Sequence, residues 1–477
     1  MNQQPNMPIA VPDASPKGRS RKGLRIFGGA GALLLLGLAG ASGYLLAYPE
    51  KAPVALHRLI EDVSGANPHP VTLMLPVERP MSAFAKLGAK IFHDRSLSGS
   101  GQQSCATCHS PEHSFGPPDG RDTELGGVDL RQQGLRPPPS LTYLYRQTGF
   151  TIGPVTAEAD DVISFDQLAQ QAQTAPRATK SAAGAPATPQ MVPSGGLFWD
   201  GRVDMLMDQA KGPMLNPAEM ANKDEAEIVA KLRRAPYAKE FTALFGPRLL
   251  DNPDMLFIEA MSALSAYQME AKAFHRFDSK YDYWLQGQAR LTHAEMRGLR
   301  LFNDPAKGNC AACHLSQPGK DGLPPMFTDT EYEALGVPRN RRLAVNRDPT
   351  HYDMGLCGPL RTDLAKQTQY CGMFLTPTLR NSARRNVYFH NGVYHSLKQV
   401  LDFYNLRAVA PERVYPKTAS GKVDIYDDLP ARYHANIDVA DTPFDRKRGG
   451  TPPLNDAEMQ DIIAFLHTLD DGYRPGS

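Results

Sequence analysis

The sequence predicts a mostly α-helical protein in which two similar domains follow a single N-terminal transmembrane helix. Three observations lead to this fold class. No run of alternating polar and apolar residues is long enough to predict a sheet, and apolar residues recur at helical spacing in several stretches. A helix followed by a cysteine-containing loop occurs twice along the chain. At the N-terminus, an apolar run follows a cluster of basic residues.

The size and charge of the chain set broad limits on its class. With 477 residues it has room for two or three domains with sizeable cores. Its 52 basic and 51 acidic residues nearly cancel, and a net charge of +1 does not predict a nucleic-acid partner. The chemistry must therefore be found in the motifs.

The N-terminus predicts export from the cytoplasm. Residues 1–25 carry several lysines and arginines, and residues 26–48 form an apolar run rich in Leu, Ala and Gly. This run is about long enough to cross a bilayer, and its basic flank predicts a cytoplasmic N-terminus and an inner-membrane anchor. A cleaved signal peptide is the alternative, because small residues at 39–43 could form a cleavage site. In both cases a Pro-punctuated tether over residues 49–80 leads into a periplasmic remainder.

Two copies of the pattern Cys-x-x-Cys-His carry the clearest chemical signal. They consist of Cys105, Cys108 and His109, and of Cys310, Cys313 and His314. This pattern is the attachment signature of c-type haem, in which two thiols form thioether bonds to the porphyrin and the histidine ligates the iron. A redox dithiol or half a zinc site needs only the two cysteines, so the added histidine argues against both. The sequence predicts two covalently bound c-type haems.

The residues before each haem motif also repeat. Three pairs of positions correspond: Gly88 and Gly298, Phe92 and Phe302, and Asp94 and Asp304. Each copy thus combines a leading helix with a haem loop, which predicts two cytochrome c-like domains, over residues 81–276 and 288–473.

Helical patterns complete both predicted domains. Residues 258–274 form a long helical candidate in the first domain, and residues 277–287 are the expected linker. The last helix is expected to start at Asn455, with Glu458 as its capping partner three residues later. It would close the second haem domain.

The stretch from residue 156 to 196 differs in character from the rest. Ala, Thr, Gln, Ser and Pro dominate it, with little apolar periodicity. We expect a mobile surface insertion, and a partner-docking loop is the alternative.

Two cysteines remain outside the haem motifs. Cys357 and Cys371 would close a short loop as a disulfide in an oxidising compartment. Two free thiols are the alternative.

Several short blocks of sequence match one family in order. They are LSGSG at 97–101, FWDGR at 198–202, QAKGP at 209–213, NPAEM at 216–220, TPTLRN at 376–381 and YFHNG at 388–392. Through them, residues from about 80 to 473 resemble the bacterial dihaem cytochrome c peroxidases and their MauG-type relatives. The 156–196 insertion lies outside the resemblance.

The resemblance implies that the first haem reacts with hydrogen peroxide and that the second relays electrons. By position, Glu219 matches the distal acid–base residue of this family, and Gln209 and Pro213 match other members of the distal pocket. A carboxylate over the iron can move a proton between the two peroxide oxygens, and burial would raise its pKa usefully. The alternative is a glutamate in the first turn of a helix, where it would complement the helix dipole.

Trp199 matches the tryptophan that lies between the two haems in this family. An indole at that place shortens the electron-transfer path. The alternative is an ordinary buried aromatic residue. The second tryptophan, Trp284, has no comparable context and is expected to be structural.

The sixth iron ligands distinguish the branches of the family. In the peroxidases a histidine from the loop after the first haem motif caps the first iron, but residues 114–143 contain no histidine. His113 lies only four residues after His109 and is a poor ligand candidate. We therefore expect a first haem that is five-coordinate or water-bound.

For the second haem, the resemblance places Tyr404 where the peroxidases have a methionine ligand and the MauG-type proteins have a tyrosine. Local spacing agrees, because Ser396 can cap a helix in which Leu397, Val400, Leu401 and Tyr404 share one face. A tyrosine that only packs in the core is the alternative, with Met326, Met354 and Met373 as fallback ligands. An anionic tyrosinate favours high-valent iron, whereas a soft thioether raises the reduction potential.

The resemblance also places a calcium ion between the domains. Its asparagine ligand falls near Tyr143, and its Thr-x-Pro ligands fall on Arg385, Asn386 and Val387. Both positions depart from the family pattern, which leaves calcium as a weak expectation.

The leading functional prediction is MauG-like oxidation by hydrogen peroxide through high-valent haems, with a partner protein as the candidate substrate. The first alternative is a cytochrome c peroxidase that takes electrons from a small cytochrome or cupredoxin. The second is a non-catalytic electron-transfer cytochrome with both irons capped.

Overall fold

The computed structural model describes residues 54–154, 191–319 and 322–476. The predicted membrane helix at 26–48 lies outside these residues, as does most of the predicted insertion, namely residues 156–190. Within the part of the chain that is described, no helix is both long and apolar enough to cross a membrane. The described residues within 61–477 form one compact unit.

The predicted tether contains a helix. Helix α2 spans Val54–Ser64, because Pro53 and Gly65 bracket this stretch instead of interrupting it. After Gly65 the chain is extended and pairs with the second haem region. The amide of Val71 donates to the carbonyl of Leu285 (2.9 Å), and that of Met74 donates to Gly322 (2.8 Å). This part of the tether is packed against the protein.

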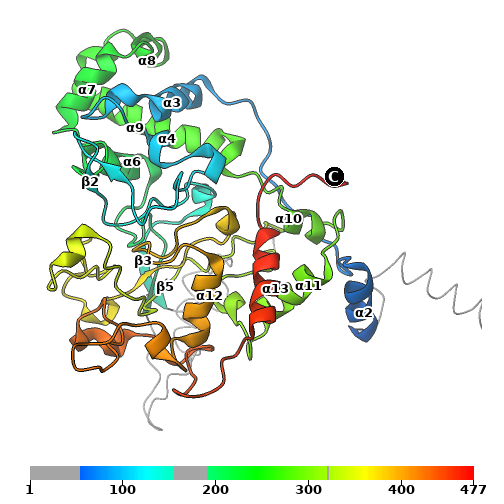
Figure 1. The fold of residues 1–477 in the computed structure, drawn as a ribbon. Coiled ribbons are helices and arrows are strands. Elements are labelled where there is room, and N and C mark those ends of the chain that lie inside the picture. The colour runs from blue at the N-terminus through cyan, green and yellow to red at the C-terminus, as the bar shows by residue number, and fades with distance from the viewer. Residues whose placement is uncertain (1–53, 155–190, 320–321, 477) are drawn as a thin grey trace, which may run out of the picture. The chain divides into compact units, whose positions relative to one another are not determined.

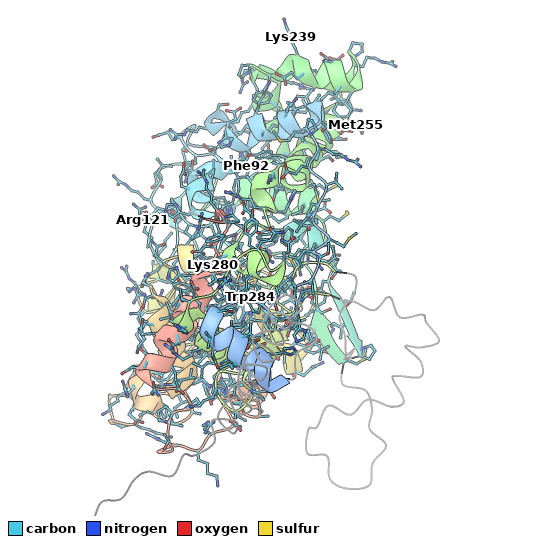
Figure 2. The ribbon with its side chains drawn as sticks, turned by 90° about the vertical axis from the view of Figure 1, so that its right-hand side faces the viewer. Phe92, Arg121, Lys239, Met255, Lys280 and Trp284 are labelled. Atoms are coloured by element: carbon cyan, nitrogen blue, oxygen red, sulfur yellow. A yellow bond between two sulfur atoms is a disulfide. The ribbon has the colours of Figure 1, made fainter. Side chains whose placement is uncertain are left out.

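Helices around the first haem motif form one region of the 61–477 unit (Figure 1). They are α3 (Ala83–His93), α4 (Cys105–Cys108), α6 (Leu206–Leu215), α7 (Glu225–Arg234), α8 (Ala238–Phe245) and α9 (Pro253–Glu270). α3 packs along α9, and Phe92 lies in the core between them. α9 corresponds to the helix predicted at 258–274, but it begins earlier, where Asn252 caps it, and ends earlier, at Glu270. Figure 2 labels Phe92 in this region.

Helices around the second motif form the other region. They are α10 (Lys280–Leu285), α11 (His293–Asn303), α12 (Leu397–Leu406) and α13 (Asp456–His467). α11 packs along α13. The predicted start of the last helix is confirmed, because the Asn455 and Glu458 side chains each bond the other residue's backbone amide in a capping box.

The expected linker at 277–287 is in fact part of the second core. It contains α10, whose Tyr281 and Trp284 are buried there, with Trp284 labelled in Figure 2. The indole of Trp284 donates to the carbonyl of Gly65 (3.1 Å), so its role is structural, as expected. Two aromatic side chains in six residues bury too much apolar surface for an exposed connection.

The mostly α fold is confirmed among the described residues, whose other regular elements are short strands and 3₁₀ turns. The strands make three two-stranded antiparallel sheets: β1 (Leu125–Gly126) with β2 (Gln132–Gln133), β3 (Thr151–Pro154) with β4 (Met191–Ser194), and β5 (Tyr332–Glu333) with β6 (Phe374–Leu375). The 3₁₀ turns are η2 (Arg95–Leu97), η3 (Pro111–His113), η4 (Leu144–Arg146), η5 (Leu249–Asp251), η6 (Lys272–Phe274), η7 (Cys310–Ala312), η8 (Ala344–Arg347), η9 (Thr368–Tyr370), η10 (Ser382–Arg384), η11 (Pro411–Arg413) and η12 (Ala431–Asn436). Strand β4 lies within the predicted insertion, so residues 191–194 are paired with β3 and are not loose.

The predicted repeat has a physical basis in two helix crossings. A Cβ atom on Gly88 of α3 would lie 1.8 Å from the carbonyl oxygen of Ala263 in α9. A Cβ atom on Gly298 of α11 would lie 1.9 Å from that of Asp461 in α13. Only glycine lets these backbones approach so closely, which explains why the same residue occurs at the same place in both copies.

Gly298→Ala is expected to lower the free energy of unfolding by about 1–3 kcal/mol or more, the usual effect of overpacking. The reason is that the new methyl group must push α13 away. Equilibrium unfolding of the haem-loaded protein in denaturant measures this. Gly153→Ala is the matched control, since nothing lies within 4 Å of a Cβ atom there. Equal stability of the two variants would contradict a tight crossing.

Candidate functional site

Each haem motif opens into its own cavity. The first cavity is lined by Cys105, Cys108 and His109 together with the predicted distal residues Gln209, Pro213 and Glu219. The second is lined by Cys310, Cys313 and His314 together with Tyr404. Trp199 is the one described residue that lines both cavities. The structure therefore places each of these predicted residues in the lining of one of the two cavities, and Trp199 in both.

The two motif histidines are held in the same way. Nδ1 of His109 bonds the carbonyl of Phe115 (3.0 Å), and Nδ1 of His314 bonds the carbonyl of Phe327 (2.8 Å). Since a carbonyl can only accept, Nδ1 carries the proton and Nε2 keeps a free lone pair for a metal. Burial lowers the pKa of both histidines to about 4, which keeps the rings neutral.

The donor set at each motif fits a c-type haem. None of the four motif cysteines is part of a disulfide, and all lie half-buried at the cavity wall beside their histidine. Two thiols for the porphyrin edge and one neutral imidazole for the iron are the groups that this cofactor requires. Both cavities would hold the haem through these three residues.

Glu219 lies in the turn that follows α6. It is therefore not in the first turn of a helix, and the dipole interpretation is wrong. Its carboxylate accepts a hydrogen bond from the side-chain amide of Asn216. Burial raises the pKa of Glu219 above its usual value, although the Asn216 bond and the charge of Arg202 act in the opposite direction. A carboxyl group in this setting is suited to proton transfer.

Helix α6 supplies the wall next to Glu219. Gln209 and Pro213 lie four residues apart, so both project from the same face into the first cavity. The turn itself is fixed by the backbone, because the amide of Met220 donates to the carbonyl of Pro213 (3.1 Å).

Trp199 is fixed by contacts from both haem regions. Its indole N–H donates to the carbonyl of Pro137 (3.4 Å), and its own carbonyl accepts from the amide of Leu375 (3.0 Å). Pro137 lines the first cavity and Leu375 lines the second. The indole is thus held at the boundary between the two cavities.

Asp200, which follows Trp199 in the sequence, belongs to a chain of buried ion pairs. Arg136 donates to Asp200 (2.9 Å) and forms a bidentate pair with Asp353 (2.7 and 2.8 Å). Arg202 binds the other oxygen of Asp200 (2.7 Å). Sequence reasoning missed Arg136 and Asp353, because nothing local indicates that residues so far apart form a pair.

Tyr404 projects from α12 into the second cavity. Leu397, Val400 and Leu401 line the same cavity, which confirms the predicted inward face of this helix. The Tyr404 ring stacks on Phe444 at a centroid distance of 5.5 Å. Burial raises the pKa of its hydroxyl above the usual value, which favours the neutral group, and the positive charge of Arg407 opposes this shift.

The fallback methionine ligands lie elsewhere. Met326, Met354 and Met373 are absent from the lining of the second cavity, whereas His390 belongs to it. The His390 ring stacks on Phe374 at 3.5 Å, and its buried Nε2 bonds no described residue. His390 is therefore a further candidate donor in this cavity besides Tyr404.

Two more residues of the first cavity were not predicted. His351 reaches it from the second haem region, and its buried Nε2 bonds no described residue. Glu124 lies beside strand β1 in the loop that lacks histidine. His113, in contrast, does not line this cavity and bonds the hydroxyl of Ser110 (3.2 Å).

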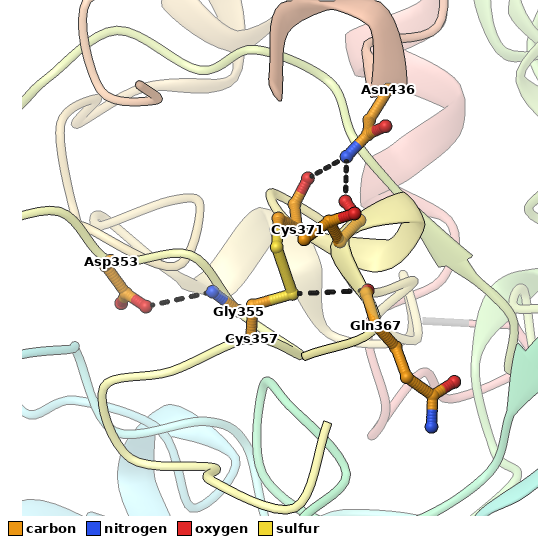
Figure 3. Close-up of a disulfide and its surroundings, with 7 residues drawn as sticks. Asp353, Gly355, Cys357, Gln367, Cys371 and Asn436 are labelled. Carbon is orange, nitrogen blue, oxygen red and sulfur yellow. Dashed lines mark hydrogen bonds between the residues drawn. A yellow bond between two sulfur atoms is a disulfide. The ribbon is translucent and has the colours of Figure 1, made fainter. Parts of the chain in front are cut away.

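The predicted disulfide forms between Cys357 and Cys371 (Figure 3). It closes a loop that begins after Asp353 and ends before Phe374, and both of these residues line the second cavity. Asn436 donates to the carbonyls of Thr368 and Cys371 and secures the loop from outside.

The oxygens at the expected calcium position form hydrogen bonds within the protein, and calcium stays a prediction of the resemblance. The hydroxyl of Tyr143 donates to Asp471 (2.6 Å), and the carbonyls of Arg385 and Asn386 accept bonds from Tyr388 and His395. The described residues contain no group of three or more His, Cys, Asp or Glu placed to hold a metal.

Comparisons with known proteins agree with this geometry. The family model of the di-haem cytochrome c peroxidases matches residues 82–290. The chain is 34% identical to the methylamine utilization protein MauG of Paracoccus denitrificans over 84% of this chain and 94% of that protein. It is 28% identical to the cytochrome c peroxidase Ccp of Escherichia coli over 85% of this chain and 61% of that protein. The solved structure of the dihaem peroxidase BthA from Burkholderia thailandensis superposes with a TM-score of 0.69 at 34% identity, covering 84% of this chain and 89% of that one.

Proposed function

The chain belongs to the family of dihaem cytochrome c peroxidases and MauG proteins, and from this premise we propose that it uses hydrogen peroxide to oxidise a partner protein, as a MauG-type enzyme. Members of this family are dihaem peroxidase-type oxidoreductases, so the chain is an enzyme of that type. A non-catalytic cytochrome is therefore not retained.

The observation that carries the proposal is Tyr404. It lines the second cavity together with His314, while the three candidate methionines do not. A phenolate oxygen is a hard, anionic donor that favours oxidised iron, whereas a thioether favours reduced iron. A His/Tyr site suits a haem that holds an oxidising equivalent more than one that only relays electrons.

The remaining residues take separate tasks. When bound, the haems supply the cleavage of the peroxide O–O bond and the storage of its two oxidising equivalents. Glu219 takes a proton from the inner peroxide oxygen and returns it to the outer one, which leaves as water. Gln209 and Pro213 shape the space beside it, and Trp199 carries electrons between the two cavities.

A second candidate function is peroxide removal with electrons from a small cytochrome or cupredoxin. The similarity to the peroxidase of Escherichia coli along most of this chain favours it. The two functions differ in where the electrons originate, and the cavities described above serve both.

We place the enzyme in the periplasm, anchored in the inner membrane by residues 26–48. The disulfide between Cys357 and Cys371 supports an oxidising compartment, and c-type haem motifs agree with export. A cleaved signal peptide would give the same compartment without the anchor.

Tyr404→Phe tests the proposal. We expect the absorption and EPR spectra of the second haem to change, because the variant lacks the oxygen donor. We also expect the oxidised variant to store fewer oxidising equivalents after addition of hydrogen peroxide. Tyr388→Phe is the matched control, since Tyr388 lines the same cavity but donates its hydroxyl to the carbonyl of Arg385.

An unchanged spectrum in Tyr404→Phe would sink the ligation by tyrosine and leave His390 as the donor to replace next. A sulfur-to-iron charge-transfer band in the wild-type protein would favour the peroxidase function. Either result would remove the basis for a MauG-type assignment.

A further inference from the structure

A second carboxyl group lines the first cavity on the same side as Glu219. Glu124 lies just before β1, and this strand contacts the turn that carries Glu219. The amide of Gly127 donates to the carbonyl of Glu219 (2.8 Å), and a Cβ atom on Gly126 would lie 2.3 Å from the carbonyl oxygen of Ala218. The segments of the two carboxyl groups are therefore in direct backbone contact.

Two buried side-chain oxygens in this region, one of Glu124 and one of Gln103, have no hydrogen-bond donor among the described residues. Oε1 of Glu124 is buried and accepts no hydrogen bond from any described residue. The same holds for Oε1 of Gln103, whose amide nitrogen donates to the carbonyl of Leu125 (3.0 Å). Buried oxygens are rarely left without a donor. A water molecule or a proton on the carboxyl group would satisfy these oxygens, and both are what a proton path requires.

On its other side, Glu124 faces the surface loop. Asp119 pairs with Arg121 (3.1 Å), and their side chains are 43% and 56% exposed. Burial raises the pKa of Glu124 to about 7, the negative charge of Asp119 adds to this, and Arg121 opposes it. The first cavity is also lined by Glu219, His351, Arg136 and Arg202. Cys108, whose thiol interacts with Glu124, no longer titrates once it is bonded to the haem. Glu124 is thus placed between solvent and cavity and can exchange protons near neutral pH.

Reduction of peroxide needs protons that Glu219 does not supply. The overall balance is H₂O₂ + 2 H⁺ + 2 e⁻ → 2 H₂O. The two electrons come from the partner, which becomes oxidised. Glu219 only moves a proton that the peroxide brings, so the first water uses the two protons of the peroxide itself. The second water needs two protons from solvent, and these must enter the first cavity.

We propose that Glu124 is the residue that passes these protons from solvent beside Asp119 into the first cavity. It gives up one proton at a time through water and takes the next from solvent. The inference deepens the function proposed above and rests on it.

The test is the pH dependence of peroxide consumption by the full dihaem enzyme, with potassium ferrocyanide as electron donor. We expect the wild-type rate to fall as the pH rises through about 7, because Glu124 then no longer holds a proton. Below neutral pH, Glu124→Gln should lower the rate by about tenfold, which is no more than the smallest usual contribution of a general acid to a rate. It should also remove the fall near pH 7, while the haem spectra stay unchanged. Glu124→Asp, which keeps a carboxyl group, should retain a pH-dependent step.

Glu112→Gln is the matched control, because Glu112 lies close to the same haem motif but is exposed and bonds Ser110. It should keep the wild-type profile. If Glu124→Gln keeps both the wild-type rate and its pH step, or if Glu124→Asp loses the step as Glu124→Gln does, the relay is wrong. If the wild-type protein consumes no peroxide with any donor, the proposed function fails instead.

Discussion

Glu219→Gln is expected to slow the reaction of the protein with hydrogen peroxide by about 10²- to 10⁴-fold, the usual contribution of a general acid–base residue. Glutamine keeps the size of the side chain and its contact with Asn216 but cannot accept and return a proton. Stopped-flow absorption of the first haem measures the rate. The spectrum before mixing shows whether the haem site is intact.

The pH dependence of this rate has a defined sign. Glu219 must be ionised to take a proton, and burial raises its pKa. The wild-type rate should therefore fall as the pH decreases through that raised pKa, and the variant should lack the fall. Glu225→Gln, at an exposed ion pair with Lys211, should react like the wild type. A rate for Glu219→Gln equal to that of this control would show that the carboxylate is not the acid–base group.

Arg380→Met is expected to lower the free energy of unfolding by about 3–5 kcal/mol, the typical effect of removing one partner of a buried ion pair. Arg380 and Asp282 are both fully buried and joined by two hydrogen bonds of 2.8 and 2.9 Å. Methionine fills the space but leaves the carboxylate of Asp282 without its charge partner. Denaturant unfolding of the haem-loaded protein measures the change.

Two further variants make this stability test specific. Replacing both partners, as in Arg380→Met with Asp282→Leu, should recover part of the loss because no buried charge remains. Lys272→Met breaks an exposed pair with Glu78 and should cost no more than about 1 kcal/mol. A loss in Arg380→Met as small as in Lys272→Met would mean that the buried pair does not secure α10 to the 376–381 segment.

The parts of the site that could be predicted are those with a local signal. The inward direction of Tyr404 follows from a capped helix with one apolar face, whereas its role as a ligand came from the family resemblance. The repeat of Gly88 in Gly298 marks the two helix crossings. The disulfide follows from two cysteines left over from the haem motifs. In each case the physical requirement is expressed within a few residues of sequence.

The parts that could not be predicted depend on contacts between distant segments. His351 enters the first cavity from the second haem region, and Arg136 pairs with Asp353 across the same boundary. In the sequence, Glu124 is a polar residue in a loop and belongs to no motif. Its relation to Glu219 depends on the backbone contact between its strand and the turn that carries Glu219. The prediction of a linker at 277–287 was wrong for a related reason, because the burial of Trp284 depends on its contacts with the rest of the second core.

The most direct test of the account is a titration of the fully oxidised, haem-loaded protein with hydrogen peroxide, without any reductant, followed by EPR and near-infrared spectroscopy. If the two cavities act together through Trp199 and Tyr404, a single equivalent of peroxide should abolish the ferric EPR signals of both haems. Loss of the first haem's signal alone, or a reaction that starts only after one haem has been reduced, would contradict the account.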